Sequence, residues 1–132
     1  MLKRYNPQSV RDVPETFQGI YTHAVEVAEP SKLLLLSGQI GVSPDGTTLP
    51  TFEQQCNQAM DNVEALLTAS GMSEKNILRV TYYLTDEANL APLTKVRQAR
   101  WASAEPPAVT TLVVAALAKP DLLVEIEVTA SQ

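Results

Sequence analysis

The feature that most constrains this chain is a pair of prolines, Pro106 and Pro107, followed by an apolar and β-branched run from Ala108 to Ala116. Proline fixes φ and has no N–H to donate, so the pair ends any helix that precedes it. The Val and Thr residues that follow favour an extended chain. The sequence therefore predicts a rigid entry into a buried strand over residues 108–116.

Two stretches, 52–69 and 90–102, have apolar residues at the spacing of amphipathic helices. The first begins at a capping box formed by Thr51 and Gln54, in which each residue satisfies a backbone N–H of the other. The second can be capped by Asn89. The sequence therefore predicts two helices separated by about twenty residues.

Shorter apolar or alternating stretches are typical of strands. They cover residues 2–5, 21–28, 33–39, 78–84, 108–116 and 122–130. The stretch 33–39 is predicted to be the hairpin partner of 21–28. Because it shows no polar face before Ser37, both of its sides are expected to be buried. Turn residues predict a surface loop over 41–50.

This order of elements predicts an α/β protein of the α+β type, a two-layer sandwich in which two helices cover one face of a mixed sheet of about six strands. We expect one domain over residues 1–132. The other face of the sheet should carry both apolar and polar side chains. The predicted members are Leu35, Ser37, Thr81, Tyr83, Val113, Leu123, Glu125 and Glu127. Because that mixture suits neither water nor a closed core, we expect a homo-oligomer with polar pockets at its seams.

Charge and composition exclude several classes of protein. The net charge is −5 and the ten basic residues are scattered, which argues against a nucleic-acid partner. The apolar runs are too short to span a membrane, and the N-terminus does not resemble a signal peptide. The single cysteine, Cys56, allows neither an internal disulfide nor a zinc site built on several thiolates. We expect a cytoplasmic protein with no metal and no cofactor.

Five segments, in this order, resemble the Rid (YjgF) family. They are Gly19–Ala24, Leu36–Ile40, Val80–Asp86, Pro106–Ala108 and Leu123–Glu127. The likeness covers nearly the whole chain. It implies a chorismate-mutase-like fold assembled as a homotrimer, with clefts between subunits that bind small metabolites.

The resemblance also implies a site. Glu125 corresponds to the residue thought to position or activate the hydrolytic water. The implied cleft-lining positions are Tyr21, Ser37, Val109, Thr110 and Thr111.

One of these positions departs from the family pattern. In the family's imine and enamine deaminases, an arginine follows the Pro-Ala pair and grips the substrate carboxylate, whereas this chain has Val109. A valine cannot replace two parallel charge-assisted hydrogen bonds, whose loss costs about 2–5 kcal/mol. We therefore expect a hydrolase or deaminase of a reactive imine, enamine or related nitrogen metabolite, with poor turnover of 2-iminopropanoate and 2-iminobutanoate.

Other polar residues have ordinary structural explanations. Glu127 and His23 are interpreted as structural, and Cys56 as part of the core. Three arginines could in principle replace the missing clamp, although solvation or a salt bridge is the ordinary state of each. They are Arg79, Arg97 and Arg100.

Two other functions stay open. The first is a non-catalytic trimeric module that binds a small metabolite, since a pocket can persist after its key binding group is lost. The second, ranked last, is an endoribonuclease, because the chain is acidic and shows no paired His/Lys/Arg catalytic cluster.

Overall fold

A computed structural model describes residues 2–132 of the chain; Met1, the first residue of the predicted domain, lies outside the described part. The two helices are α1 (Phe52–Ala69) and α2 (Leu90–Arg100). The strands are β1 (Leu2–Tyr5), β2 (Ala24–Val27), β3 (Leu33–Leu35), β4 (Gln39–Ile40), β5 (Ile77–Leu84), β6 (Ala108–Val113) and β7 (Val124–Ser131). Three 3-10 turns, η1 (Glu15–Phe17), η2 (Glu74–Asn76) and η3 (Glu87–Asn89), join them.

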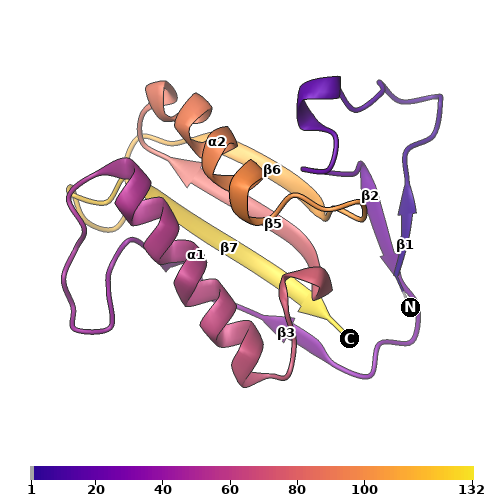
Figure 1. Cartoon of the computed structure of the whole chain (residues 1–132), viewed down its shortest axis with the longest axis horizontal. Coiled ribbons are helices and arrows are strands. Elements are labelled where there is room, and N and C mark those ends of the chain that lie inside the picture. Colours follow the sequence, from indigo (N-terminus) through magenta and orange to yellow (C-terminus); the bar gives the residue numbers. More distant parts are fainter. Residues whose placement is uncertain (1) are drawn as a thin grey trace.

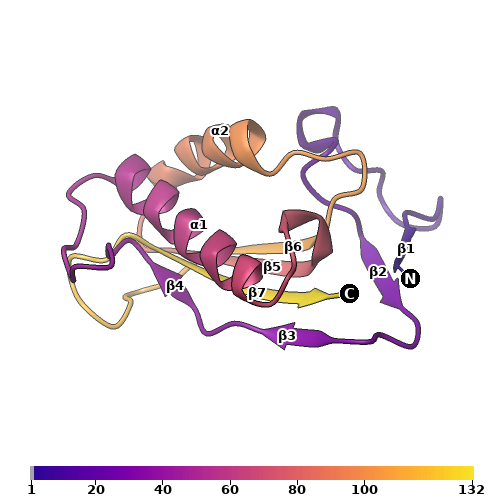
Figure 2. The ribbon, with the colours of Figure 1, turned by 60° about the horizontal axis from the view of Figure 1, so that its bottom comes forward.

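The main sheet has the order β3-β7-β5-β6, and β4 also pairs with β7. Only β5 and β6 run parallel, and the other pairs are antiparallel. Both helices lie on one face of this sheet (Figures 1 and 2). The predicted two-layer α+β sandwich with a mixed sheet is therefore confirmed. The sheet has five strands rather than about six, because β1 and β2 form a separate ribbon.

Both predicted helices are present. Thr51 and Gln54 form the complete capping box of α1, and Gly71 follows the helix with a φ of 75°. The helix α2 begins directly after Asn89, but the Asn89 side chain makes no capping hydrogen bond. Instead, the preceding turn η3 is capped by Asp86, which accepts a hydrogen bond from the N–H of Ala88.

The predicted hairpin between 21–28 and 33–39 is wrong. Strand β2 pairs with β1, whereas β3 pairs with the C-terminal strand β7. The apolar β3 packs Leu34 against the main core, but as an edge strand it is covered on one face only. Leu33 and Leu35 therefore remain 55% and 71% exposed, and the predicted burial of both sides is wrong for the single chain.

The register of β6 assigns its side chains to the two faces. Val109 and Val113 pair with Val80 and Leu84, which are buried beneath the helices. Because side chains alternate along a strand, Thr110 projects from the opposite, open face of the sheet. The strand ends at Val113 rather than at residue 116.

Two apolar residues predicted for the open face belong elsewhere. Val113 lies in register with the buried Leu84 and so shares the helix-covered face. Leu123 precedes β7 and packs against the core cluster. The open face is consequently more polar at the β7 end than expected.

The two prolines at the entry to β6 also hold the N-terminal ribbon. The carbonyl of Pro106 accepts a hydrogen bond from Arg4 Nε at 2.8 Å, and that of Pro107 accepts one from the N–H of Thr22 at 2.9 Å. This connection places Tyr21, which precedes Thr22, beside the start of β6.

None of the helices within residues 2–132 has the length and apolar character needed to cross a membrane.

Candidate functional site

Three of the predicted cleft residues line one pocket, of about 330 Å³, between the N-terminal segment, α2 and β6. These are Tyr21, Val109 and Thr111. We call this cavity the Tyr21 pocket. Its complete lining is Arg11, Pro14, Phe17, Tyr21, Leu90, Leu93, Thr94, Arg97, Val109 and Thr111. None of these described residues is acidic, and two of them are arginines.

Aromatic contacts position Tyr21 at this pocket. Its ring centroid lies 6.2 Å from that of Phe17 and 5.7 Å from that of His23, with an edge-on arrangement to the histidine. The Nε2 atom of His23 lies 2.6 Å from the carbonyl oxygen of Arg11. The histidine thus braces the loop that carries Tyr21, as its structural interpretation predicts.

Arg97 differs from an ordinary arginine of a pocket wall because it is buried and makes few hydrogen bonds. It lies on α2, is only 7% exposed, and its Cζ atom is 5.6 Å from the Phe17 ring and 5.3 Å from the Tyr82 ring. Its Nη1 donates a long hydrogen bond, 3.4 Å, to Thr111 Oγ1, and its Nε is buried with no hydrogen-bond partner among residues 2–132. Burial lowers the pKa of the Arg97 guanidinium from its ordinary value.

No Asp or Glu among residues 2–132 forms an ion pair with Arg97. By contrast, Arg100 Nη2 lies 2.7 Å from an Asp61 oxygen and 2.6 Å from a Glu64 oxygen. Arg79 is exposed on β5. Of the three arginines predicted as possible clamps, only Arg97 is therefore both buried and without an acidic partner.

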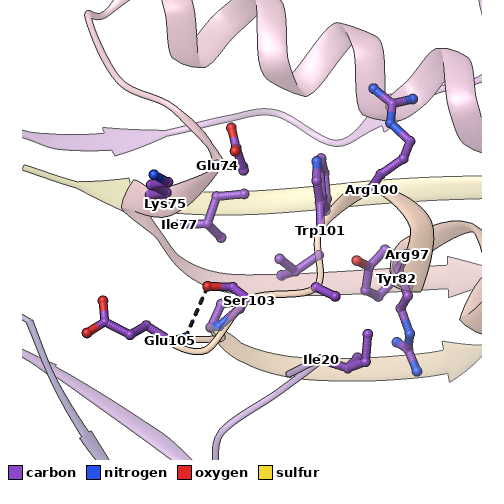
Figure 3. Close-up of a pocket in the computed structure, with 13 residues that line it drawn as sticks. Ile20, Glu74, Lys75, Ile77, Tyr82, Arg97, Arg100, Trp101, Ser103 and Glu105 are labelled. Atoms are coloured by element: carbon purple, nitrogen blue, oxygen red, sulfur yellow. Dashed lines mark hydrogen bonds between the residues drawn. The ribbon is translucent and has the colours of Figure 1, made fainter. Parts of the chain in front are cut away.

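Figure 3 shows a smaller cavity, of about 90 Å³, which is lined by both Arg97 and Arg100 and by the residues that follow α2. In this view the guanidinium groups of Arg97 and Arg100 extend in opposite directions. Arg100 extends toward α1, where its acidic partners lie. Arg100 is thus held by acidic partners on α1, whereas Arg97 lines both this cavity and the Tyr21 pocket.

The remaining predicted residues lie at the open face of the sheet or at its edge. Glu125 on β7 is half-buried and pairs in register with Tyr83, while Ser37 and Thr110 are exposed. A Cβ at Gly38 would overlap the Glu125 carboxylate, so the glycine is what leaves room for this side chain. Sequence reasoning missed Gly38, although it stands next to the predicted Ser37.

A second carboxylate lies beside Glu125 on the same strand and face. The hydroxyl of Tyr83 donates a hydrogen bond of 3.0 Å to Glu127 Oε1. This bond raises the pKa of Tyr83. Glu127 thus has a cross-strand partner, in agreement with its structural interpretation.

The six predicted residues therefore form two groups rather than one site within a single chain. Val109 and Thr111 belong to the helix-covered face of β6, and Tyr21 lies with them. Thr110 and Glu125 project from the open face, and Ser37 borders it next to β4. Residues 2–132 contain no cluster of three His, Cys, Asp or Glu side chains able to hold a metal ion.

The fold and these two groups of residues define an α+β protein of the Rid type. Residues 14–132 match the family model described as Endoribonuclease L-PSP, and the chain belongs to this family, the Rid (YjgF) family. A Rid-family protein of Yersinia pestis superimposes with a TM-score of 0.86 at 27% identity, over 99% of this chain and 98% of that one.

Two relatives extend the comparison. A RutC family protein of Aquifex aeolicus is 38% identical over 79 residues, which are 59% of this chain and 61% of that protein. The protein TdcF of Escherichia coli, named a putative reactive intermediate deaminase, is 30% identical over 79 residues, 59% of each chain. The chain thus spans about three-fifths of the length of these relatives.

Proposed function

We propose that this chain is a hydrolase of the deaminase type, acting on a reactive imine, enamine or related small nitrogen metabolite. The observation that carries the proposal is the placement of Glu125, half-buried on the open face with its carboxylate over Gly38. The similarity to TdcF supports the reaction class. The proposed roles are water handling for Glu125 and cleft lining for Tyr21, Ser37 and Thr110.

The chemistry requires one carboxylate and one water molecule. The water oxygen attacks the imine carbon while Glu125 takes a proton from the water, and the electron pair of the C=N bond moves to nitrogen. Glu125 then returns this proton to nitrogen, which gives a carbinolamine. Glu125 next transfers the hydroxyl proton of the carbinolamine to its NH2 group, the C–N bond breaks, and ammonia leaves as the carbonyl forms. The balance is an imine plus water giving a carbonyl compound plus ammonia, with no cofactor.

A single chain does not bring Glu125 to the Tyr21 pocket, because the sheet lies between them. We propose that a homotrimer completes the cleft, with the open face of one subunit facing the Tyr21 pocket of its neighbour. Exposed leucines on the open face support this arrangement, since Leu35 is 71% and Leu112 is 45% exposed. The metabolite would then bind between subunits.

Val109 restricts the substrate in this proposal. Its side chain is half-buried and apolar, so it offers no charge to a carboxylate at the position from which the family's arginine acts. We therefore expect poor turnover of 2-iminopropanoate and 2-iminobutanoate. A rate equal to that of arginine-bearing relatives would contradict this restriction.

The test is ammonia release from a panel of imines and enamines generated in situ from amino acids by an amino-acid oxidase. The Glu125→Gln variant keeps the shape of the side chain but cannot take the proton, and we expect a loss of about 100-fold or more. Gly38→Ala, whose methyl group displaces the Glu125 carboxylate, should give a similar loss. The exposed Glu87→Gln is the matched control. The proposal fails if no member of the panel releases ammonia, or if Glu125→Gln matches the wild type.

A non-catalytic metabolite-binding module is the second candidate. The observation in its favour is that the Tyr21 pocket offers a cation and aromatic rings but no acidic side chain among its described residues. A ligand that stays bound through purification without being turned over would favour this function. An endoribonuclease ranks last, because the net charge is −5. RNA cleavage by the wild type that is lost in Glu125→Gln or Tyr21→Phe would be needed to revive it.

A further inference from the structure

We propose that Arg97 is an anion-binding residue and that the Tyr21 pocket takes a small organic molecule with one carboxylate and an apolar body. The residue acts from helix α2, on a different wall of the pocket from Val109 on β6. The binding claim stands on the geometry of Arg97 and its pocket. Only its consequence for the substrate rests on the function proposed above.

The first argument is the missing counter-charge. A buried charge ordinarily has an ionic partner, because taking it out of water is costly. Arg97 is 7% exposed and its guanidinium has one long hydrogen bond, to the neutral hydroxyl of Thr111. Its Nε is buried with no acceptor among the described residues. A carboxylate in the pocket would supply what the chain itself does not.

The second argument is the electrostatic balance of the cavity. Arg11 also lines the Tyr21 pocket, and no described lining residue is acidic, although the whole chain carries a net charge of −5. A cavity with two cations and no anion in an acidic protein favours a negatively charged ligand. The guanidinium fork suits a planar carboxylate in particular.

The third argument concerns the rest of the ligand. Phe17, Tyr21, Leu93 and Val109 give the pocket an aromatic and aliphatic lining. Its volume, about 330 Å³, lies in the range of sites for small organic molecules. The Phe17 and Tyr82 rings near the Arg97 Cζ atom hold the guanidinium by cation–π contact, and cation–π contact uses none of its N–H donors.

This placement changes how the absence of an arginine at position 109 is interpreted. The carboxylate-binding cation has moved from the strand to the facing helix rather than vanished. A carboxylate held by Arg97 would place the neighbouring carbon differently from one held at position 109. If the proposed deaminase function holds, the preferred substrates are therefore larger imino acids rather than the two short ones.

The test uses phenylacetate and its neutral counterpart phenylacetamide, titrated into the protein of 132 residues by calorimetry. We expect phenylacetate to bind and phenylacetamide to bind at least about tenfold more weakly, since the charge-assisted hydrogen bonds are lost. Arg97→Met should lower phenylacetate affinity by a similar factor, and Arg97→Lys, which keeps the charge but not the fork, should recover part of it. Lys95→Met, an exposed charge on the same helix, is the matched control and should leave binding unchanged.

Thermal unfolding separates this role from a structural one. Because Arg97 is buried without a counter-ion, Arg97→Met should unfold at the same temperature as the wild type or higher, whereas a structural arginine would lower it. Phenylacetate should raise the unfolding temperature of the wild type and of Lys95→Met but not that of Arg97→Met. Equal binding of the two probes, no binding of either, or unchanged binding in Arg97→Met would each overturn the proposal. Because calorimetry measures binding without turnover, failure of the deaminase function in the ammonia assay is scored separately.

Discussion

At the scale of single residues, Cys56 shows how burial in the core changes the pKa of a side chain. The thiol is completely buried on the inner face of α1, and desolvation raises its pKa from about 9 to about 12. The folded protein therefore favours the protonated thiol more strongly than the unfolded chain does. This contribution to stability is complete below about pH 9 and is lost as pH rises toward about 12.

The measurement is the free energy of unfolding in urea at several pH values from about 8 to 10.5. We expect wild-type stability to fall more steeply above about pH 9 than that of Cys56→Ala, although the variant starts lower because of its cavity. Parallel pH profiles for the two proteins would show that the thiol does not contribute. Tyr82, whose pKa burial also raises, is common to both proteins and cancels in the comparison.

The limits of sequence reasoning are also clearest at this scale. Residues 109, 110 and 111 were predicted together as cleft residues, yet strand alternation assigns Thr110 to the opposite face from its neighbours. The alternation was visible in the sequence. Arg97 was predicted only as one of three possible clamps, and its distinguishing property, the lack of an acidic partner, depends on distant residues. Its position next to Val96 on the buried side of α2 was the available signal.

At the scale of elements, one arginine ties the two helices together. Arg100 at the end of α2 donates to the Asn57 carbonyl at 2.9 Å and pairs with Asp61 and Glu64, all on α1. The indole N–H of Trp101 donates to the same Glu64 carboxylate at 3.1 Å. Because the network is partly exposed, each ion pair is weakened by solvent, and the shared geometry gives the network its strength.

Replacing this arginine should loosen the contact between the helices. We expect Arg100→Met to lower the free energy of unfolding by about 1–2 kcal/mol, because Glu64 and the Asn57 carbonyl lose their donor. Lys95→Met, an exposed charge on the same helix, should change it by less than about 0.5 kcal/mol. Urea unfolding at low and high salt checks both values, and the difference between the variants should shrink in high salt. An Arg100→Met protein as stable as the wild type would mean that the ion pairs contribute nothing.

Helices and strands differed in how well the sequence predicted them, for a physical reason. The capping box and apolar spacing of α1 are local, so its limits, Phe52–Ala69, agree with the prediction. Strand pairing is non-local, and proximity along the chain suggested the wrong partner for β3. Exposed and half-buried residues alternate along β2, as expected of a strand in a two-stranded ribbon. Strand β3 consists of consecutive leucines, as expected of a strand in the main sheet. Pattern therefore predicted the type of each element better than its partner.

At the scale of the whole molecule, the open face of the sheet connects fold and function. It combines the exposed Leu33, Leu35 and Leu112 with the polar row of Glu125, Tyr83 and Glu127. A face of this kind is costly to leave in water, and its polar residues include the proposed water-handling carboxylate. The homotrimer that we propose would cover these leucines. The same contact would bring Glu125 of one subunit to the Tyr21 pocket of its neighbour. Assembly and activity should therefore fail together.

That coupling can be tested by placing a charge on the open face. Leu35→Lys on β3, and Leu112→Lys on β6 at the opposite edge of the same face, would each bury an unpaired ammonium in the assembled protein. Both should therefore shift the mass measured by light scattering after gel filtration toward the monomer. Val10→Lys changes a comparably exposed apolar residue, 44%, outside the sheet and should leave the mass unchanged. The monomeric variants should keep the far-ultraviolet circular dichroism of the fold but lose ammonia release, because each Glu125 is separated from its pocket. Full activity in a monomeric variant would show instead that one chain suffices, and a wild type that is monomeric at all concentrations would remove the shared cleft.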